Sequence, residues 1–330
     1  DEPDLFAAKL GAEDWHRVSW TDDHDYLWRG DTSSGDLAAH FFGFPLYFDL
    51  CAKDDLERSA LSNRVAALMR VILEAGYRIE DVDGEVTTDG YWGPERIAIA
   101  LDGADACEAS LERCEESWTG ESWLKSIEIL GHLLATYHMS ADPLFYEAYE
   151  ELIALHRYDE LSLPHAQSLS LTCPSLMDPA THKAAFLALH TLIRYEADAA
   201  RRAQWLDALA FLVTWEGTER RPLWAALAVL ALGEGHVDVE AALVSLREAA
   251  LMQQNWMVDN RHRRDALEWP NDASGAAQFD RVFAYDELPA SFDAINPHAK
   301  LHEGDGRRVL SPTSWLLPFY AFRYSGVLSD

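Results

Sequence analysis

The amino-acid sequence predicts an all-α fold, an (α/α)6-type toroid of helical hairpins with irregular inserts, formed as one domain over residues 1–330. Three observations lead to this expectation. Apolar residues recur at helical spacing through most of the chain, whereas the alternation typical of β-strands is scarce. One pattern, an apolar helix followed by an acidic turn and an amphipathic helix, occurs four times. The apolar fraction of 48% is sufficient for one large core.

The repeated pattern predicts four helical hairpins, at residues 43–73, 126–155, 184–213 and 224–251. Each has an aspartate where its second helix should begin: Asp54, Asp142, Asp198 and Asp238. A carboxylate at this N-cap position accepts hydrogen bonds from the free N–H groups of the first helical turn. The hairpins are unevenly spaced, whereas an open solenoid needs regular repeats, so a closed ring with apolar inner helices is favoured.

The inserts between the hairpins are expected to form the rim of a pocket. Residues 79–103 are rich in turn-forming residues, and a short two-stranded ribbon is expected around Asp83 and Gly84. Residues 259–310 are rich in Asn, Asp, Pro, His and Arg and predict a long irregular excursion. The apolar stretch that begins at Trp315 is expected to return to a helix that completes the ring.

Composition excludes several classes of partner. The chain has 56 acidic and 27 basic side chains, a net charge of −29, and no stripe of lysine or arginine. Nucleic acids and anionic membrane surfaces are therefore not expected partners. The longest apolar run, which begins at Pro222, is shorter than the roughly 20 residues that cross a membrane, so a soluble protein is expected. Because the chain begins at Asp1 rather than at methionine, we expect that an N-terminal piece has been removed, which is compatible with export.

Residues 28–51 predict a helix that is apolar on almost every face and is entered through a polar cluster containing Asp31, Asp36 and His40. One interpretation is structural: a serine caps the helix, and Asp36 complements the positive end of its dipole. The other interpretation is functional. His40 follows Asp36 by four residues, so the two side chains share a helix face suited to a proton relay or a shared metal.

A second candidate segment is TTDGYWGPE, residues 87–95, which places Asp89, Trp92 and Glu95 on a loop stiffened by glycine and proline. Aromatic rings beside carboxylates suit sugars, because a pyranose stacks on the ring while the acid binds hydroxyls or transfers a proton. The chain has 12 tryptophans, which favours this interpretation. The alternative is that the tryptophans fill gaps between curved helices.

A third candidate segment is WMVDNRHRRD, residues 256–265, which brings together Asn260, His262 and Arg263. An amide or guanidinium that neutralises a carboxylate, beside a histidine that removes a proton, is suited to β-elimination from a uronate. The alternative is a solvated helix end with charges that complement the helix dipole.

No metal site is assigned from the sequence. His132 and His138 fall on one expected helix but on different faces, and His132 is interpreted as a hydrogen-bonded core histidine. The sequence contains no CxxC, nucleotide-binding glycine loop, GxSxG or HExxH motif, which disfavours those enzyme and metal-binding classes. No cofactor and no oligomeric state is assigned.

These segments resemble an uncharacterised bacterial family of helical-ring proteins with a DTSSDE-x-x-GH-like start, here DTSSGDLAAH at residues 31–40. The resemblance extends to RPLW (221–224), NRHRRD (260–265) and LLPFYAFRYSGVL (316–328). The chain departs from that pattern at Gly35, where an acid is usual, and at Ala39, which replaces a glycine. More distantly, a helical ring with a DGYW loop is similar to unsaturated glucuronyl hydrolases and toroidal polysaccharide lyases, which implies sugar chemistry.

The sequence therefore predicts a carbohydrate-active enzyme, a glycoside hydrolase or polysaccharide lyase, whose oligosaccharide substrate can contain uronic acid. The expected catalytic residues are Asp36, Asp89, His40 and His262. The expected substrate-binding residues are Asp31, Trp92, Glu95, Asn260 and Arg263. Two alternatives stay open: a non-catalytic glycan-binding or scaffold protein on the same ring, and a metal-dependent or cyclase-like enzyme with an apolar cavity.

Overall fold

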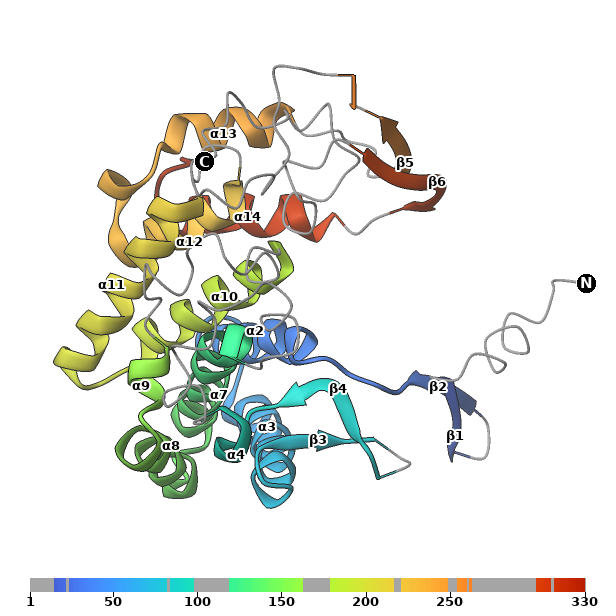
Figure 1. The fold of residues 1–330 in the computed structure, drawn as a ribbon, viewed down its shortest axis with the longest axis vertical. Coiled ribbons are helices and arrows are strands. Elements are labelled where there is room, and N and C mark those ends of the chain that lie inside the picture. Colours follow the sequence, from blue (N-terminus) through green and yellow to red (C-terminus); the bar gives the residue numbers. More distant parts are fainter. Residues whose placement is uncertain are drawn as a thin grey trace, which may run out of the picture.

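A computed structural model describes residues 15–21, 24–81, 84–97, 119–162, 179–216, 221–248, 254–259, 261–262, 301–309 and 312–329. These parts of the chain are mostly helical, which confirms the all-α prediction (Figure 1). None of the helices described there is long and apolar enough to cross a membrane.

All four predicted hairpins are present. They are α2 (Ser34–Leu50) with α3 (Asp55–Glu74), α7 (Thr119–Ser140) with α8 (Pro143–His156), α10 (Pro179–Tyr195) with α11 (Ala199–Glu216), and α12 (Pro222–Leu232) with α13 (Val239–Glu248). Short helices α4 (Pro94–Ile97), α9 (Tyr158–Leu161) and η3 (Glu234–His236) lie between them, and α14 (Thr313–Tyr324) follows as the predicted closing helix. The first helices α7, α10 and α12 are largely buried, and the second helices expose one face, as the apolar and amphipathic patterns require. Helix α2 differs: it is apolar on almost every face, yet Asp36, His40 and Leu50 are among its several exposed residues.

The predicted aspartate caps are confirmed. Asp54 accepts a hydrogen bond from the N–H of Glu57 at 2.9 Å, which satisfies a donor that the first turn of α3 leaves free. The remaining three predicted caps, Asp142, Asp198 and Asp238, accept equivalent bonds at 2.9–3.1 Å. Each cap uses residues within three positions of the aspartate, so the local sequence suffices to specify it.

Replacing Asp54 by alanine is expected to lower the free energy of unfolding by about 1 kcal/mol, because the N-terminal donors of α3 lose their acceptor. Urea denaturation followed by circular dichroism measures this change. Asn63 is exposed in the middle of the same helix, so Asn63→Ala is the control and should leave stability unchanged or slightly higher. Equal losses in the two variants would contradict the capping role.

The first helices of the hairpins pack against one another as an inner layer. Helix α7 packs against both α2 and α10, α10 packs against α12, and α12 packs against α14. Gly131 allows α7 to approach α10 closely, because a Cβ at this position would lie 3.4 Å from the carbonyl oxygen of Ala188. The inner helices run in parallel, because ring contacts join the first turns of α7, α10 and α12 at one end and hydrogen bonds join the last turns of α2, α7 and α10 at the other. Closure of this layer into a complete ring stays a prediction.

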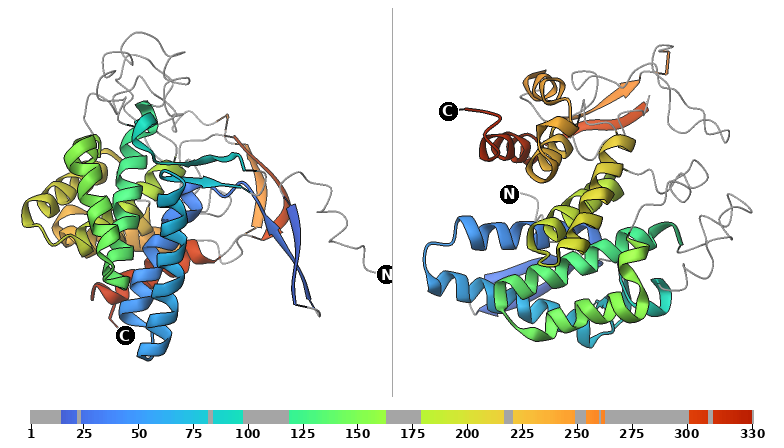
Figure 2. Two further views of the ribbon diagram at one scale, coloured as in Figure 1. Left: turned by 90° about the horizontal axis from the view of Figure 1, so that it is seen from below. Right: turned by 90° about the vertical axis from the view of Figure 1, so that its left-hand side faces the viewer.

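Strands occur in three antiparallel pairs within the described residues: β1 (Trp15–Thr21) with β2 (His24–Arg29), β3 (Arg78–Glu80) with β4 (Val86–Tyr91), and β5 (Gln254–Asp259) with β6 (Leu301–Val309). The pair β3–β4 confirms the predicted ribbon. Figures 1 and 2 show all three pairs on the same side of the helical body. Because β2 directly precedes α2 and β6 directly precedes α14, this is the side on which these two helices begin.

The prediction that residues 259–310 are irregular is wrong for β6. Its sequence, LHEGDGRRV, contains two glycines and four charged residues and has little intrinsic strand preference. Pairing with β5 supplies the backbone hydrogen bonds that stabilise it, and this partner lies more than forty positions earlier in the chain. A pattern search within a short window cannot detect such pairing.

Candidate functional site

The start of α2 is held by reciprocal hydrogen bonds. The Ser33 hydroxyl accepts a bond from the N–H of Asp36 at 3.3 Å, and the Asp36 carboxylate accepts one from the N–H of Ser33 at 3.4 Å. This is a capping box, so the structural interpretation of Asp36 is confirmed. The Asp36 side chain is nevertheless exposed, as is His40 one turn later, whose ring stacks on Phe44 at 5.3 Å. Asp31 donates its N–H to Asp81 of the β3–β4 ribbon at 2.8 Å, which ties this ribbon to the start of α2.

Asp89 lies at the surface within β4, so the prediction that a loop carries it is wrong, whereas Trp92 follows directly after the strand and is buried. The indole N–H of Trp92 donates to the carboxylate of Glu128 at 2.9 Å, and the Trp92 carbonyl accepts from the Tyr158 hydroxyl at 2.7 Å. Trp92 has no exposed surface, so it presents no face on which a sugar could stack in this structure. Its position instead orients Glu128, and the predicted sugar-platform role of Trp92 finds no support.

Lys125 of α7 joins the two segments that the sequence singled out. Its ammonium group donates to the hydroxyl of Ser34, in the first turn of α2, at 2.5 Å and to the carbonyl of Asp89 at 2.7 Å. The lysine is only 6% exposed. A buried ammonium group is costly unless it is hydrogen-bonded, so this bridge holds the start of α2 and the end of β4 in a defined arrangement.

Glu128 and His132 lie on the same face of α7 as Lys125, at helical spacings of three and four residues, and both are buried. The His132 ring stacks on Phe41 at 4.2 Å and meets the edge of Trp92 at 5.7 Å. The expected core position of His132 is confirmed, but neither ring nitrogen has a hydrogen-bond partner among the described residues. Burial, together with the charge of Lys125, lowers the pKa of His132 to about 3, and the ring is neutral at physiological pH.

The first turns of the other inner helices lie at the same end of the molecule. His182 of α10 has its ring 6.3 Å from those of both Trp123 in α7 and Trp224 in α12. Arg221, the residue before α12, is buried with its guanidinium 4.0 Å from the Trp224 ring. Four helix N-termini with their positive dipole ends therefore converge here. We call the cluster the helix-start site and define it by Ser34, Asp36, Asp89, Lys125, Glu128, His182 and Arg221.

Two further predicted residues, Glu95 and His262, are described elsewhere on the surface. Glu95 is exposed and bonds to the Tyr91 hydroxyl, which adds to the effect of burial in raising the pKa of Tyr91. His262 is exposed in the turn after β5, at the end of the β5–β6 ribbon that lies away from α14. Asn260 and Arg263 fall outside the described residues. Among the residues that the structure describes, no three His, Cys, Asp or Glu side chains gather into a possible metal site.

Lys125, Glu128, His182 and Arg221 were not predicted as site residues from the sequence. A detectable signal exists for the first two, because WLKSIEILGHLL carries two charged residues in an otherwise apolar stretch of an inner helix. Charged side chains on such a helix must be paired or serve a function. Arg221 opens the RPLW segment singled out in the sequence, and its burial against Trp224 places it at the helix-start site.

No protein-family model, curated protein or solved structure matches this chain. The helix-start site combines exposed carboxylates with buried cations and helix N-termini, which together suit acid–base chemistry on an anionic substrate.

Replacing Trp92 by phenylalanine is expected to lower the free energy of unfolding by about 1–3 kcal/mol more than replacing Trp123 by phenylalanine does. Both tryptophans are buried, but the Trp92 indole donates to Glu128, whereas the Trp123 indole N–H has no hydrogen-bond partner among the described residues. The matched pair separates the lost hydrogen bond from the lost ring volume. Chemical denaturation of both variants gives the difference, and equal losses would show that the bond to Glu128 contributes nothing.

Proposed function

We propose that this protein is a carbohydrate-active enzyme that acts at the helix-start site on an oligosaccharide containing uronic acid. The observation that carries the proposal is the Lys125 bridge, which ties the segment bearing Asp36 to the segment bearing Asp89. Two exposed carboxylates from distant parts of the sequence are thereby held on neighbouring segments at one end of the inner helices.

The chemistry of the site supports an anionic sugar. Lys125 and Arg221 supply positive charge in a chain whose net charge is −29, and the convergent helix N-termini add to it. In hydrolysis, one of Asp36 and Asp89 would protonate the glycosidic oxygen while the other acts as base or nucleophile. In elimination, the cations would stabilise the uronate carboxylate while a base removes the proton from the adjacent carbon.

The arrangement of the helices supports a ring around this site. The inner helices are parallel, and α14 follows α12 in the inner layer. Side chains of α14 and of α2 line one cavity at the opposite end of the molecule, so the last inner helix lies across from the first. We propose that the inner layer closes in this way into the predicted toroid.

The proposal is tested by incubating the purified protein with uronic-acid-containing and neutral oligosaccharides. New reducing ends without ultraviolet absorbance identify hydrolysis, whereas both signals together identify elimination, which forms an unsaturated uronide. Asp36→Asn and Asp89→Asn are each expected to reduce turnover by at least about 100-fold. Asp207→Asn, at an exposed position of α11, is the control. Full activity in both site variants would refute the assignment.

A non-catalytic glycan-binding protein is the second candidate. It is favoured by Gly35, which stands where the resembling family has an acid, and by the capping hydrogen bonds that engage the Asp36 carboxylate. This candidate predicts calorimetric binding of a uronate oligosaccharide with no product formed, and binding that survives Asp36→Asn and Asp89→Asn.

A further inference from the structure

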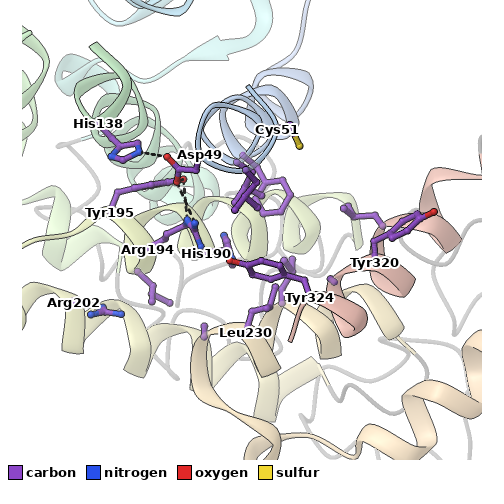
Figure 3. Close-up of a pocket in the computed structure, with 18 residues that line it drawn as sticks. Asp49, Cys51, His138, His190, Arg194, Tyr195, Arg202, Leu230, Tyr320 and Tyr324 are labelled. Atoms are coloured by element: carbon purple, nitrogen blue, oxygen red, sulfur yellow. Dashed lines mark hydrogen bonds and ion pairs between the residues drawn. The ribbon is translucent and has the colours of Figure 1, made fainter. Parts of the chain in front are cut away.

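A second site lies at the opposite end of α2 from the helix-start site. A cavity of about 1070 Å³ is lined by residues from the last turns of α2, α7 and α10, together with parts of α11, α12 and α14 (Figure 3). Helix α2 has 17 residues and separates the two ends by about 25 Å. The cavity is at the upper end of the roughly 300–1,000 Å³ typical of small-molecule sites.

The walls of this cavity are mainly aliphatic and aromatic. They are formed chiefly by Phe42, Leu46, Ile193, Leu227, Leu230 and Leu317. A sugar placed against such walls would leave its hydroxyl groups without hydrogen-bond partners, which is unfavourable. The body of a ligand that fits here is therefore apolar.

One side of the cavity is polar and tightly paired. Asp49, near the end of α2, lies 2.7 Å from His138, 3.0 Å from the Tyr195 hydroxyl and 3.3 Å from Arg194 (Figure 3). Burial opposes ionisation of Asp49, but the hydrogen bonds from His138, Tyr195 and Arg194 outweigh it and hold the pKa of Asp49 below its usual value. The negative charge of Asp49 and the positive charge of the Arg194 guanidinium therefore neutralise each other. Burial lowers the pKa of His190, which also lines the cavity, to about 4, so this ring adds no charge at physiological pH.

With Arg194 paired to Asp49, the positive charge of Arg202 on α11 remains on the cavity wall. The Arg202 side chain lines the cavity and, unlike the neighbouring Arg201, which pairs with Glu150 and Glu196, it has no carboxylate partner within the described part of the chain. Among the described residues that line the cavity there is one carboxylate, Asp49, against two guanidinium groups, Arg194 and Arg202. The chain has a net charge of −29, yet none of its described carboxylates pairs with Arg202 beside this apolar cavity. Such an arginine is suited to a ligand that brings its own anion.

We propose that this cavity binds an amphipathic carboxylate, a small molecule with one carboxylate group and an alkyl or ring body. The carboxylate pairs with the guanidinium of Arg202, and the body lies against Leu46, Leu230 and Leu317. The exposed rings of Tyr320 and Tyr324 on α14 flank the cavity and shield part of the ligand from water. The site is independent of the proposed carbohydrate chemistry, since none of its residues belongs to the helix-start site.

Isothermal titration calorimetry of the full chain with decanoate tests this inference. Decanol is the comparison ligand, because it has the same apolar body but no charge. Decanoate is expected to bind, and Arg202→Gln is expected to weaken it about tenfold or more, because a charge-assisted hydrogen bond is lost. The affinity for decanol should be the same in both proteins. Arg247→Gln, at an exposed position of α13 outside the cavity, is the matched control and should bind decanoate like the unmodified chain.

The proposal is overturned if decanoate does not bind, or if Arg202→Gln binds it as tightly as the unmodified chain does. It is also overturned if decanol binds as tightly as decanoate to the unmodified chain. Because Arg202 is exposed, its replacement should not impair folding, and a circular dichroism melting curve checks this. Asp36→Asn should retain full decanoate affinity, so failure of the carbohydrate proposal and failure of this one give different results.

Discussion

Replacing Arg201 by leucine is expected to lower the free energy of unfolding by about 3–5 kcal/mol, because it leaves a buried carboxylate without its cation. Arg201 of α11 donates to both carboxylate oxygens of Glu150 on α8, at 2.7 and 3.1 Å. Its Nε lies 3.2 Å from the carboxylate of Glu196, whose side chain has no exposed surface. Glu196 also accepts hydrogen bonds from the Tyr149 hydroxyl and from the N–H of Asp198, but neither supplies positive charge.

Urea denaturation measures this loss, with Arg247→Leu as the control. Arg247 forms an ion pair with Glu240 at 3.4 Å, but both side chains are largely exposed, so its replacement should cost less than about 1 kcal/mol. Adding Glu196→Gln to the Arg201→Leu variant should recover part of the stability, because it removes the uncompensated charge. A loss below about 1 kcal/mol in Arg201→Leu, or no recovery in the double variant, would contradict this account of the cluster.

Replacing Lys125 by methionine is expected to release the start of α2 from the end of β4 and to lower the free energy of unfolding by about 1–3 kcal/mol. Methionine preserves most of the volume of the side chain but donates no hydrogen bond, so Ser34 and the carbonyl of Asp89 lose their shared partner. Turnover of any substrate found for the helix-start site should fall at least tenfold, since the two carboxylate-bearing segments are no longer held together.

Hydrogen–deuterium exchange tests the Lys125 prediction without a known substrate. Amide exchange in residues 31–37 and 86–91 should be faster in Lys125→Met than in the unmodified chain. Lys53→Met changes an exposed lysine in the turn between α2 and α3 and should leave exchange in both segments unaltered. Unchanged exchange in Lys125→Met would show that the bridge does not position these segments.

The sequence by itself determined the hairpins, their caps and the β3–β4 ribbon. These features depend on interactions between close neighbours, such as Asp54 with Glu57 three residues later, and on apolar spacing within one helix. The acidic turns and the buried inner helices were predictable for the same reason. Asp36 and Asp89 could be singled out as polar residues at the ends of such elements, although their proximity could not.

Only the tertiary structure decided which side chains form the site. Lys125 meets Ser34 across 91 positions, and Trp92 meets Glu128 across 36. The sequence left open whether Trp92 is exposed, and packing buried it. The sequence indicated a hydrogen-bonded His132, whereas no described residue forms a hydrogen bond with that ring. Asp49, His138 and Arg194 meet because the parallel inner helices bring their last turns to one end, and Arg202 lines the same cavity from the first turn of α11. Pattern within a segment specifies local structure, but helix packing sets which distant residues share a site.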